Sequence, residues 1–210
     1  MRSADLATAI RVALAFVIGY LIIIQASAIL VVLLILLIVV LDNVDGYLAR
    51  SGRPSLLGYL SYSGKEARGI EVPKDKDAKK APKYGSGLDI AGDRITEYVF
   101  WIVFAYLRVI PLFVVFIFIT RNSVSDALTL SAGKSFSKMR TKFGRVASSH
   151  ASRGLYMASK TLAFIYLSLV YIAGWPAWIG YALTAIVVAG SLIRGSAEIY
   201  EALLALGALG

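Results

Sequence analysis

Cysteine is missing from the chain, and histidine occurs only once. The missing thiol excludes a disulfide framework and any catalysis through a thiolate. Charged residues are also scarce, because they make up only 17% of the 210 residues, whereas hydrophobic residues make up 58%. A water-soluble domain of this size needs more polar surface, so the composition predicts an integral membrane protein.

Positive charge is in excess, with a formal net charge of +9. It is concentrated in two segments, 50–83 and 121–160, which lie between strongly apolar stretches. Basic segments beside a membrane favour anionic lipid headgroups and phosphorylated molecules as partners. We therefore expect membrane lipids and a phosphorylated substrate as partners, and no nucleic acid.

Six apolar segments have the length expected of membrane spans or come near it. They cover 6–24, 27–44, 93–107, 110–120 with an extension toward 130, 155–173 and 177–206. The positive-inside rule places the two basic segments and both chain ends in the cytoplasm. The sequence thus predicts an all-α, multi-pass membrane protein with six transmembrane helices. Trp101, Trp175 and Trp178 are expected to anchor it at the membrane interface.

The first apolar segment has a second interpretation. Arg2, the apolar run and Ala26-Ser27-Ala28 resemble a cleavable signal peptide. Asp5 and Arg11 flank or interrupt the run, however, and another apolar segment follows at once. We therefore expect a first transmembrane helix here.

Four aspartates lie where apolar segments meet charged sequence: Asp42, Asp45, Asp89 and Asp93. Ionised carboxylates at membrane depth are costly and usually mark a functional site. Spacings of three and four residues place each pair on one face of a helix. Four facing carboxylates repel one another strongly, so bound cations are expected. An oxygen-only ligand set favours Mg²⁺ or Mn²⁺, and we expect a pair of ions.

A plainer interpretation makes these aspartates helix caps at a solvated boundary. Their neighbours favour a site, because Gly46 and Gly85 would let a ligand approach the backbone closely. Arg50 lies on the same helix face as Asp42, where its guanidinium can hold a phosphate. Gly92 is expected to permit close packing of two helices.

These residues resemble the signature of the CDP-alcohol phosphotransferase family. Its eight positions are all matched, by Asp42, Asp45, Gly46, Ala49, Arg50, Gly85, Asp89 and Asp93. The six apolar segments are similar to that family's transmembrane fold, and Asp5-Leu6-Ala7-Thr8 stands where such enzymes carry a motif that contacts the nucleotide. The gap between Arg50 and Gly85 is far longer than in the family. The excess predicts a cytoplasmic insertion at about 52–84, which we expect to be a solvated loop, with binding of anionic lipid as the alternative.

The resemblance implies one membrane domain, 1–210, in which six transmembrane helices surround a polar, metal-binding cavity open to the cytoplasm. It implies an enzyme of phospholipid biosynthesis that transfers a phosphatidyl-type group, diacyl or ether-linked, from a CDP-linked lipid to an alcohol and releases CMP. All four aspartates would bind metal, and Asp93 would also be the general base. The CDP-lipid would be bound by Asp5, Thr8, Gly46, Ala49, Arg50 and Gly85. Family members are commonly dimers, so a homodimer stays open.

The second basic segment bears on the acceptor alcohol. Cations near the aspartates suit an acceptor that carries its own phosphate, and we select Arg121, Arg153, Lys160 and Arg194 for this role. The surroundings of the first three resemble phosphatidylglycerophosphate synthases, which makes glycerol 3-phosphate the first choice, ahead of inositol phosphate and serine. Topology alone also predicts cytoplasmic lysines and arginines, and Arg194 could instead pair with Glu198 four residues later.

Two other classes of protein stay open. An ion- or proton-coupled transporter would also carry intramembrane aspartates, but it gives no reason for Gly46, Arg50 and Gly85 at these spacings. A structural module that only binds lipid would need none of the four aspartates. The complete signature favours the transferase.

Overall fold

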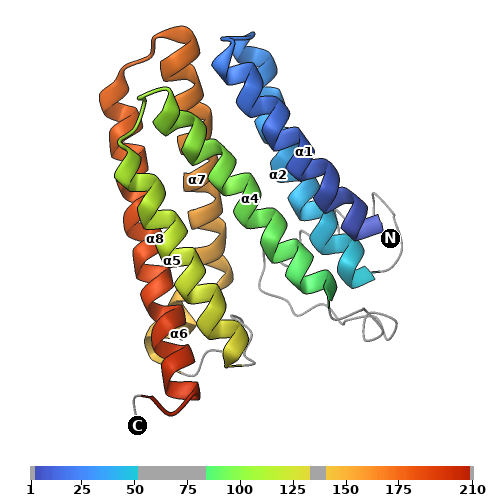
Figure 1. Cartoon of the computed structure of the whole chain (residues 1–210), viewed down its shortest axis with the longest axis vertical. Helices are drawn as coiled ribbons and strands as arrows, with labels where there is room; N and C mark the ends of the chain where they lie inside the picture. Colours follow the sequence, from blue (N-terminus) through green and yellow to red (C-terminus); the bar gives the residue numbers. More distant parts are fainter. Residues whose placement is uncertain (1–2, 52–83, 133–140, 209–210) are drawn as a thin grey trace. The chain divides into compact units, whose positions relative to one another are not determined.

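The computed structural model describes the backbone of residues 3–51, 84–132 and 141–208, and the side chains of 6–42, 87–132, 141, 144–149 and 152–208. All regular structure in these residues is α-helical. The helices are α1 (Ser3–Ile23), α2 (Ala28–Ser51), α4 (Tyr84–Tyr106), α5 (Leu112–Ser131), α6 (Lys142–Ala147), α7 (His150–Ala173) and α8 (Ala177–Ala205). Figure 1 shows their order along the chain.

Four of the described helices are long and apolar enough to cross a membrane. These are α1, α5, α7 and α8, and the part of α2 with described side chains, Ala28–Asp42, is also apolar. The prediction of an all-helical chain with membrane-spanning segments is confirmed to this extent. Each of the six predicted segments also falls on a helix, but a count of six spans stays a prediction.

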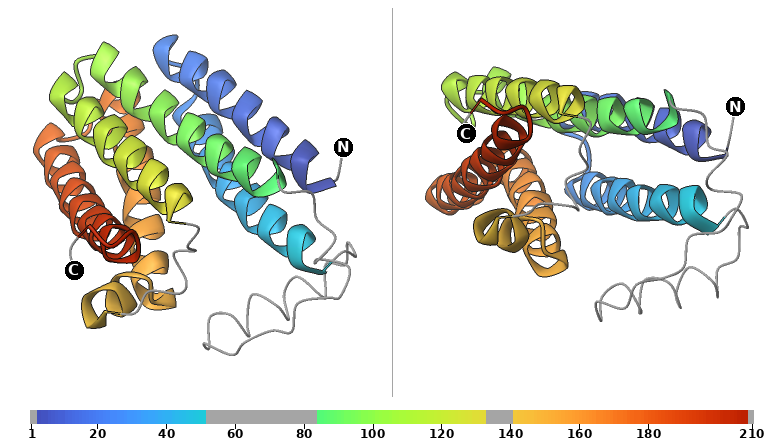
Figure 2. Two further views of the ribbon diagram at one scale, coloured as in Figure 1. Left: turned by 60° about the horizontal axis from the view of Figure 1, so that its bottom comes forward. Right: turned by 90° about the horizontal axis from the view of Figure 1, so that it is seen from below.

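The chain divides into two compact units, Met1–Phe100 and Trp101–Gly210, called here the first and the second unit. In the first unit, α1 and α2 pack side by side (Figures 1 and 2). Their connection is tight, because Gln25 takes a φ of 53° and Ala26 N–H donates to the Leu21 carbonyl. Six buried hydrophobic residues of this pair repeat at intervals of three and four, as a helical face requires; they are Ala15, Ile18, Ile22, Val31, Ile35 and Ile38.

The second unit is built around aromatic side chains. Trp101, near the end of α4, stacks on Phe118 of α5 at a ring distance of 4.6 Å and meets Phe164 of α7 edge-on at 4.8 Å. Trp101 has no exposed surface, so its prediction as an interface anchor is wrong. Stacking and edge-on contacts between rings stabilise a packed core, and this explains why the indole faces inward.

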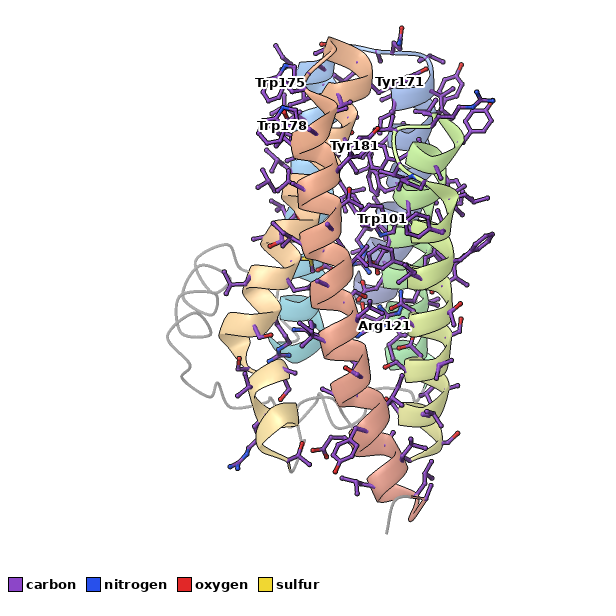
Figure 3. The ribbon with its side chains drawn as sticks, turned by 90° about the vertical axis from the view of Figure 1, so that its left-hand side faces the viewer. Trp101, Arg121, Tyr171, Trp175, Trp178 and Tyr181 are labelled. Carbon is purple, nitrogen blue, oxygen red and sulfur yellow. The ribbon has the colours of Figure 1, made fainter. Side chains whose placement is uncertain are left out.

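Trp175 and Trp178, in contrast, are exposed. With Tyr171 and Tyr181, they lie toward the end of the hairpin where α7 turns into α8, as Figure 3 shows. The turn itself is short because Gly174 caps the end of α7 in the left-handed conformation, with a φ of 69°, and Pro176 is the N-cap of α8. Their role as interface anchors stays a prediction, and this position at the tip of a hairpin suits it.

The helices extend beyond the apolar segments at their polar ends. α4 begins at Tyr84 rather than near 93, and α7 begins at His150 rather than near 155. The short helix α6 was not predicted. Side-chain caps explain two of these starts, since Thr141 Oγ1 accepts from Gly144 N–H and Ser149 Oγ accepts from Ser152 N–H. Hydropathy alone does not detect such caps.

Candidate functional site

Three of the four signature aspartates meet at one arginine in the first unit. Arg11 of α1 forms ion pairs with Asp42 of α2 and, through Nη2, with Asp93 of α4 at 2.7 Å. Asp89 Oδ1, one turn earlier on α4, lies 3.7 Å from the same Nη2 atom. We call these four residues the Arg11 cluster. It joins three helices through charge.

The helices place Arg11 inside and the carboxylates at the edge. Arg11 shares the buried face of α1 with Thr8 and Ala15, and its side chain is only 2% exposed. The side chain of Asp42 is 23% exposed, whereas those of Asp93 and Asp89 are 50% and 58% exposed. A buried guanidinium among apolar helices is costly unless carboxylates pair with it. The half-exposed aspartates stay accessible to a ligand.

Gly92 allows α4 to approach α1 at this point. A Cβ at Gly92 would clash with Thr8 Cγ2 and would lie 3.4 Å from Arg11 Nη2. The prediction that Gly92 permits close helix packing is therefore confirmed. Thr8, which the sequence assigns to nucleotide binding, is buried in this contact between α1 and α4.

The donor set of the cluster suits a hard divalent cation by its chemistry. Its three carboxylates contribute −3 and its guanidinium +1, so the four side chains carry a formal charge of −2. Carboxylate oxygens are the ligands that Mg²⁺ and Mn²⁺ prefer. Yet no group of three or more acidic, histidine or cysteine side chains in the described residues is arranged to hold a metal ion. The carboxylates face Arg11 instead.

Several predicted site residues have side chains outside the described set. Asp5 lies in the first turn of α1, and Gly85 lies in the first turn of α4. The C-terminal part of α2 carries Asp45, Gly46, Ala49 and Arg50. The expected insertion lies outside the described residues up to position 83. The predicted roles of these residues stay predictions.

Arg11 is the site residue that the sequence interpretation missed. It was taken only as an interruption of the first apolar run. A lone arginine in the middle of an otherwise uncharged helical segment is a signal in itself, because such a residue needs an acidic partner. The sequence alone does not show from which helix that partner comes.

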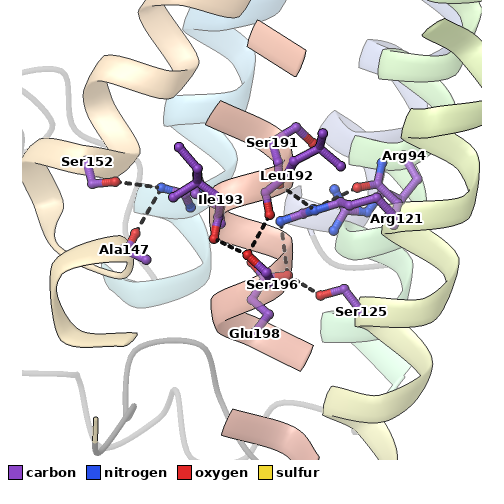
Figure 4. Close-up of polar contacts among 12 residues, drawn as sticks. Arg94, Arg121, Ser125, Ala147, Ser152, Ser191, Leu192, Ile193, Ser196 and Glu198 are labelled. Atoms are coloured by element: carbon purple, nitrogen blue, oxygen red, sulfur yellow. Dashed lines mark hydrogen bonds and ion pairs between the residues drawn. The ribbon is translucent and has the colours of Figure 1, made fainter. Parts of the chain in front are cut away.

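The second unit holds a separate polar network around Arg121. Arg121 Nε donates to the Ser191 carbonyl at 3.1 Å, Nη1 to Asn122 Oδ1 at 2.7 Å and Nη2 to Glu198 Oε2 at 3.1 Å (Figure 4). Ser125 Oγ also donates to Glu198. Arg121 and Glu198 are 9% and 11% exposed, so this is a nearly buried ion pair between α5 and α8. We call these five residues the Arg121 network.

Arg194 points to another part of the second unit. Its Nη1 donates to the Ala147 carbonyl at 3.1 Å and to Ser152 Oγ at 3.3 Å (Figure 4). The guanidinium also lies 5.2 Å from the centre of the Tyr156 ring, and Lys160 Nζ lies 5.6 Å from that centre. Arg194 and Lys160 are thus brought together on one ring.

Of the four residues selected for the acceptor phosphate, three lie on α7 and α8 and one on α5. Arg153 and Lys160 belong to α7, one turn on either side of Tyr156. Arg121 is engaged in its own network with α8. The aspartates belong to the first unit and these cations to the second, so a common site for the two sets stays a prediction.

No protein-family model, no curated protein and no solved structure matches this chain. The resemblance of the eight signature positions to the CDP-alcohol phosphotransferases therefore stays a prediction from sequence.

Proposed function

We propose that the chain is a CDP-alcohol phosphotransferase that works within the membrane. It would transfer a phosphatidyl-type group from a CDP-linked lipid to an alcohol and release CMP. One observation carries the proposal: Asp42 on α2 and the pair Asp89 and Asp93 on α4 share a single partner, Arg11. The two halves of the signature are far apart in sequence, and the chemistry requires them to meet.

The reaction balances without any redox partner. The acceptor hydroxyl attacks the lipid-bearing phosphorus, a new P–O bond forms, and the bond from that phosphorus to the CMP oxygen breaks. Asp93 takes the hydroxyl proton, and its half-exposed carboxylate is accessible to an acceptor. Bound at the aspartates, a pair of Mg²⁺ or Mn²⁺ ions would supply positive charge that stabilises the charge developing on the phosphoryl oxygens.

The remaining signature residues would bind the CDP-lipid. Arg50 would hold the diphosphate, and Gly46 and Gly85 would let the nucleotide approach the backbone. We propose six membrane spans with the site open to the cytoplasm, so that the lipid tails stay in the bilayer while the headgroup reaches the aspartates.

Glycerol 3-phosphate is the acceptor that we propose first. Arg194 and Lys160 lie together on the Tyr156 ring, and two clustered cations suit an acceptor with its own phosphate. Arg153 lies on the same helix as Lys160. Inositol phosphate would fit the same cations, whereas serine gives them no phosphate to bind.

The test is release of CMP by the purified protein. Glycerol 3-phosphate, inositol 1-phosphate and serine are offered separately with CDP-diacylglycerol and Mg²⁺ or Mn²⁺. We expect CMP with glycerol 3-phosphate, and a loss of at least about 100-fold in Asp93→Asn, because general base catalysis typically contributes about 10²–10⁴-fold. Asp126→Asn on α5 makes the same chemical change outside the cluster and should keep full activity. No CMP with any acceptor would reject the reaction class.

An ion-coupled transporter is the second candidate. The specific observation in its favour is the Arg11–Asp42 pair at 2% and 23% exposure, since intramembrane charge pairs are typical of coupled transport. The same protein in liposomes would then move ions or protons and release no CMP. The two candidates are thus separated by one preparation and two readouts.

A further inference from the structure

Arg11 stands where the proposed chemistry requires a metal ion. Its guanidinium lies between acidic side chains from two other helices, with Asp42 on one side and Asp89 and Asp93 on the other. The carboxylates that would bind a divalent cation are therefore already neutralised in part by a side chain of the protein. Like charges brought this close would otherwise repel one another.

At Nη2, charge rather than a directed hydrogen bond holds this guanidinium to α4. Arginine usually recognises carboxylates through parallel hydrogen bonds from its planar fork. Here Nε and Nη2 of Arg11 are buried, and neither has a hydrogen-bond partner among the residues that the structure describes. Nη2 nevertheless lies 2.7 Å from Asp93 Oδ1. A cation of higher charge density could replace this arrangement without breaking a well-formed bidentate pair.

We propose that Arg11 is a built-in counter-ion that a divalent cation displaces from the aspartates. Without metal, Arg11 keeps the carboxylates of α2 and α4 together. With metal, the carboxylates turn to the ion and the guanidinium leaves them. This inference rests on the proposed function in one respect, namely that the aspartates bind Mg²⁺ or Mn²⁺. Arg11 is then a positioning residue that sets metal affinity.

The first test compares Mn²⁺ binding by the wild type and Arg11→Met, with free Mn²⁺ measured by electron paramagnetic resonance. Removing a competing positive charge a few ångströms from the ion should tighten Mn²⁺ binding by at least about tenfold. Arg94→Met is the matched control, because Arg94 lies in the same unit and its ion pair is with Glu97. Unchanged affinity in Arg11→Met, or equal tightening in Arg94→Met, would overturn the proposal.

The second test needs no metal and uses a double-mutant cycle in EDTA. Asp93→Asn in the wild type breaks a pair with Arg11 and should lower the melting temperature. Asp93→Asn in Arg11→Met removes a repelling carboxylate and should raise it. This reversal of sign depends on charge, so loss of packing would not produce it. A change of the same sign in both backgrounds contradicts the counter-ion role.

Folding of the variants is itself informative. Arg11→Met should melt at a lower temperature than the wild type in EDTA and recover with Mn²⁺, because the ion replaces the missing charge. A variant that stays unfolded in Mn²⁺ would overturn the proposal. Arg11→Lys keeps the positive charge, so Mn²⁺ should raise its melting temperature less than that of Arg11→Met. An equal rise in both variants would also contradict the counter-ion role.

Failure of this inference is distinguishable from failure of the enzyme proposal. If the wild type binds Mn²⁺ and releases CMP while Arg11→Met binds Mn²⁺ no more tightly, only the counter-ion role is wrong. If the wild type neither binds Mn²⁺ nor releases CMP, the reaction class and the displacement by metal are both wrong.

Discussion

Arg11 and Arg121 are both nearly buried arginines on apolar helices, yet they are stabilised in different ways. Arg11 is surrounded by carboxylates and forms few directed hydrogen bonds. Arg121 donates from all three of its nitrogens, to a backbone carbonyl, an amide oxygen and a carboxylate. A guanidinium that donates from each of its three nitrogens fixes two helices in one geometry, whereas one held mainly by charge can be displaced. The Arg121 network therefore suits a structural role, and the Arg11 cluster suits a ligand site.

The Arg121–Glu198 pair gives a prediction at this scale. Glu198→Gln leaves the Arg121 charge nearly buried without its acidic partner, which should cost about 3–5 kcal/mol of stability. The double variant Arg121→Met with Glu198→Leu removes both charges and should cost less than the single change. Denaturation in detergent micelles measures both. Ser196→Ala is the control, because the exposed Ser196 hydroxyl bonds to the Leu192 and Ile193 carbonyls of its own helix. A double variant less stable than Glu198→Gln would contradict this account.

The same residues explain why the site could be predicted only in part. The spacing of the aspartates follows from sequence, and the structure brings Asp42, Asp89 and Asp93 to one point. The identity of their partner did not follow, because a charged residue in an apolar run shows that it needs a partner and does not show which helix supplies it. Trp101 was misassigned for a related reason, since its ring contacts come from α5 and α7.

At the scale of elements, helix positions were predictable where the bilayer dictates composition. Each predicted apolar segment coincides with a helix, because about 20 apolar residues in succession can satisfy their backbone in a membrane only as a helix. The polar ends of α4 and α7, and the whole of α6, escape that rule. Caps at Thr141 and Ser149 define the starts of α6 and α7, and Thr141 N–H also donates to Glu201 Oε1.

Two glycines on α4 give a matched pair of predictions for helix packing. Gly92→Ala adds a methyl group that clashes with Thr8 and crowds Arg11, so α4 must move away from α1. We expect a loss of about 1–3 kcal/mol, as for other overpacked contacts. Gly87→Ala on the same helix meets nothing within 4 Å and should gain about 0.5–1 kcal/mol from helix propensity. The melting temperatures of the two variants in EDTA test this. Equal changes in both would mean that the close approach of α4 to α1 at Gly92 does not contribute to stability.

At the scale of the whole molecule, the sequence predicts six membrane spans. The described helices support four of them by length and hydropathy. The part of α2 with described side chains, Ala28–Asp42, is apolar as far as it goes. α2 and α4 carry the aspartates, so they are polar where the site lies. The described part of α4 carries Asp89, Asp93, Arg94 and Glu97, and these charged side chains keep its hydropathy below that of a span.

The missing cysteines make this topology directly testable. A single cysteine can be introduced at one position at a time and labelled with a maleimide that does not cross membranes. With six spans and cytoplasmic ends, Ser63→Cys and Ser148→Cys should react only from the cytoplasmic side. Ser27→Cys and Trp175→Cys, at the exposed turns after α1 and α7, should react only from the opposite side. Labelling of Ser27→Cys and Ser63→Cys from the same side would mean that α2 does not cross the membrane, and the aspartates could not then face a cytoplasmic nucleotide as proposed.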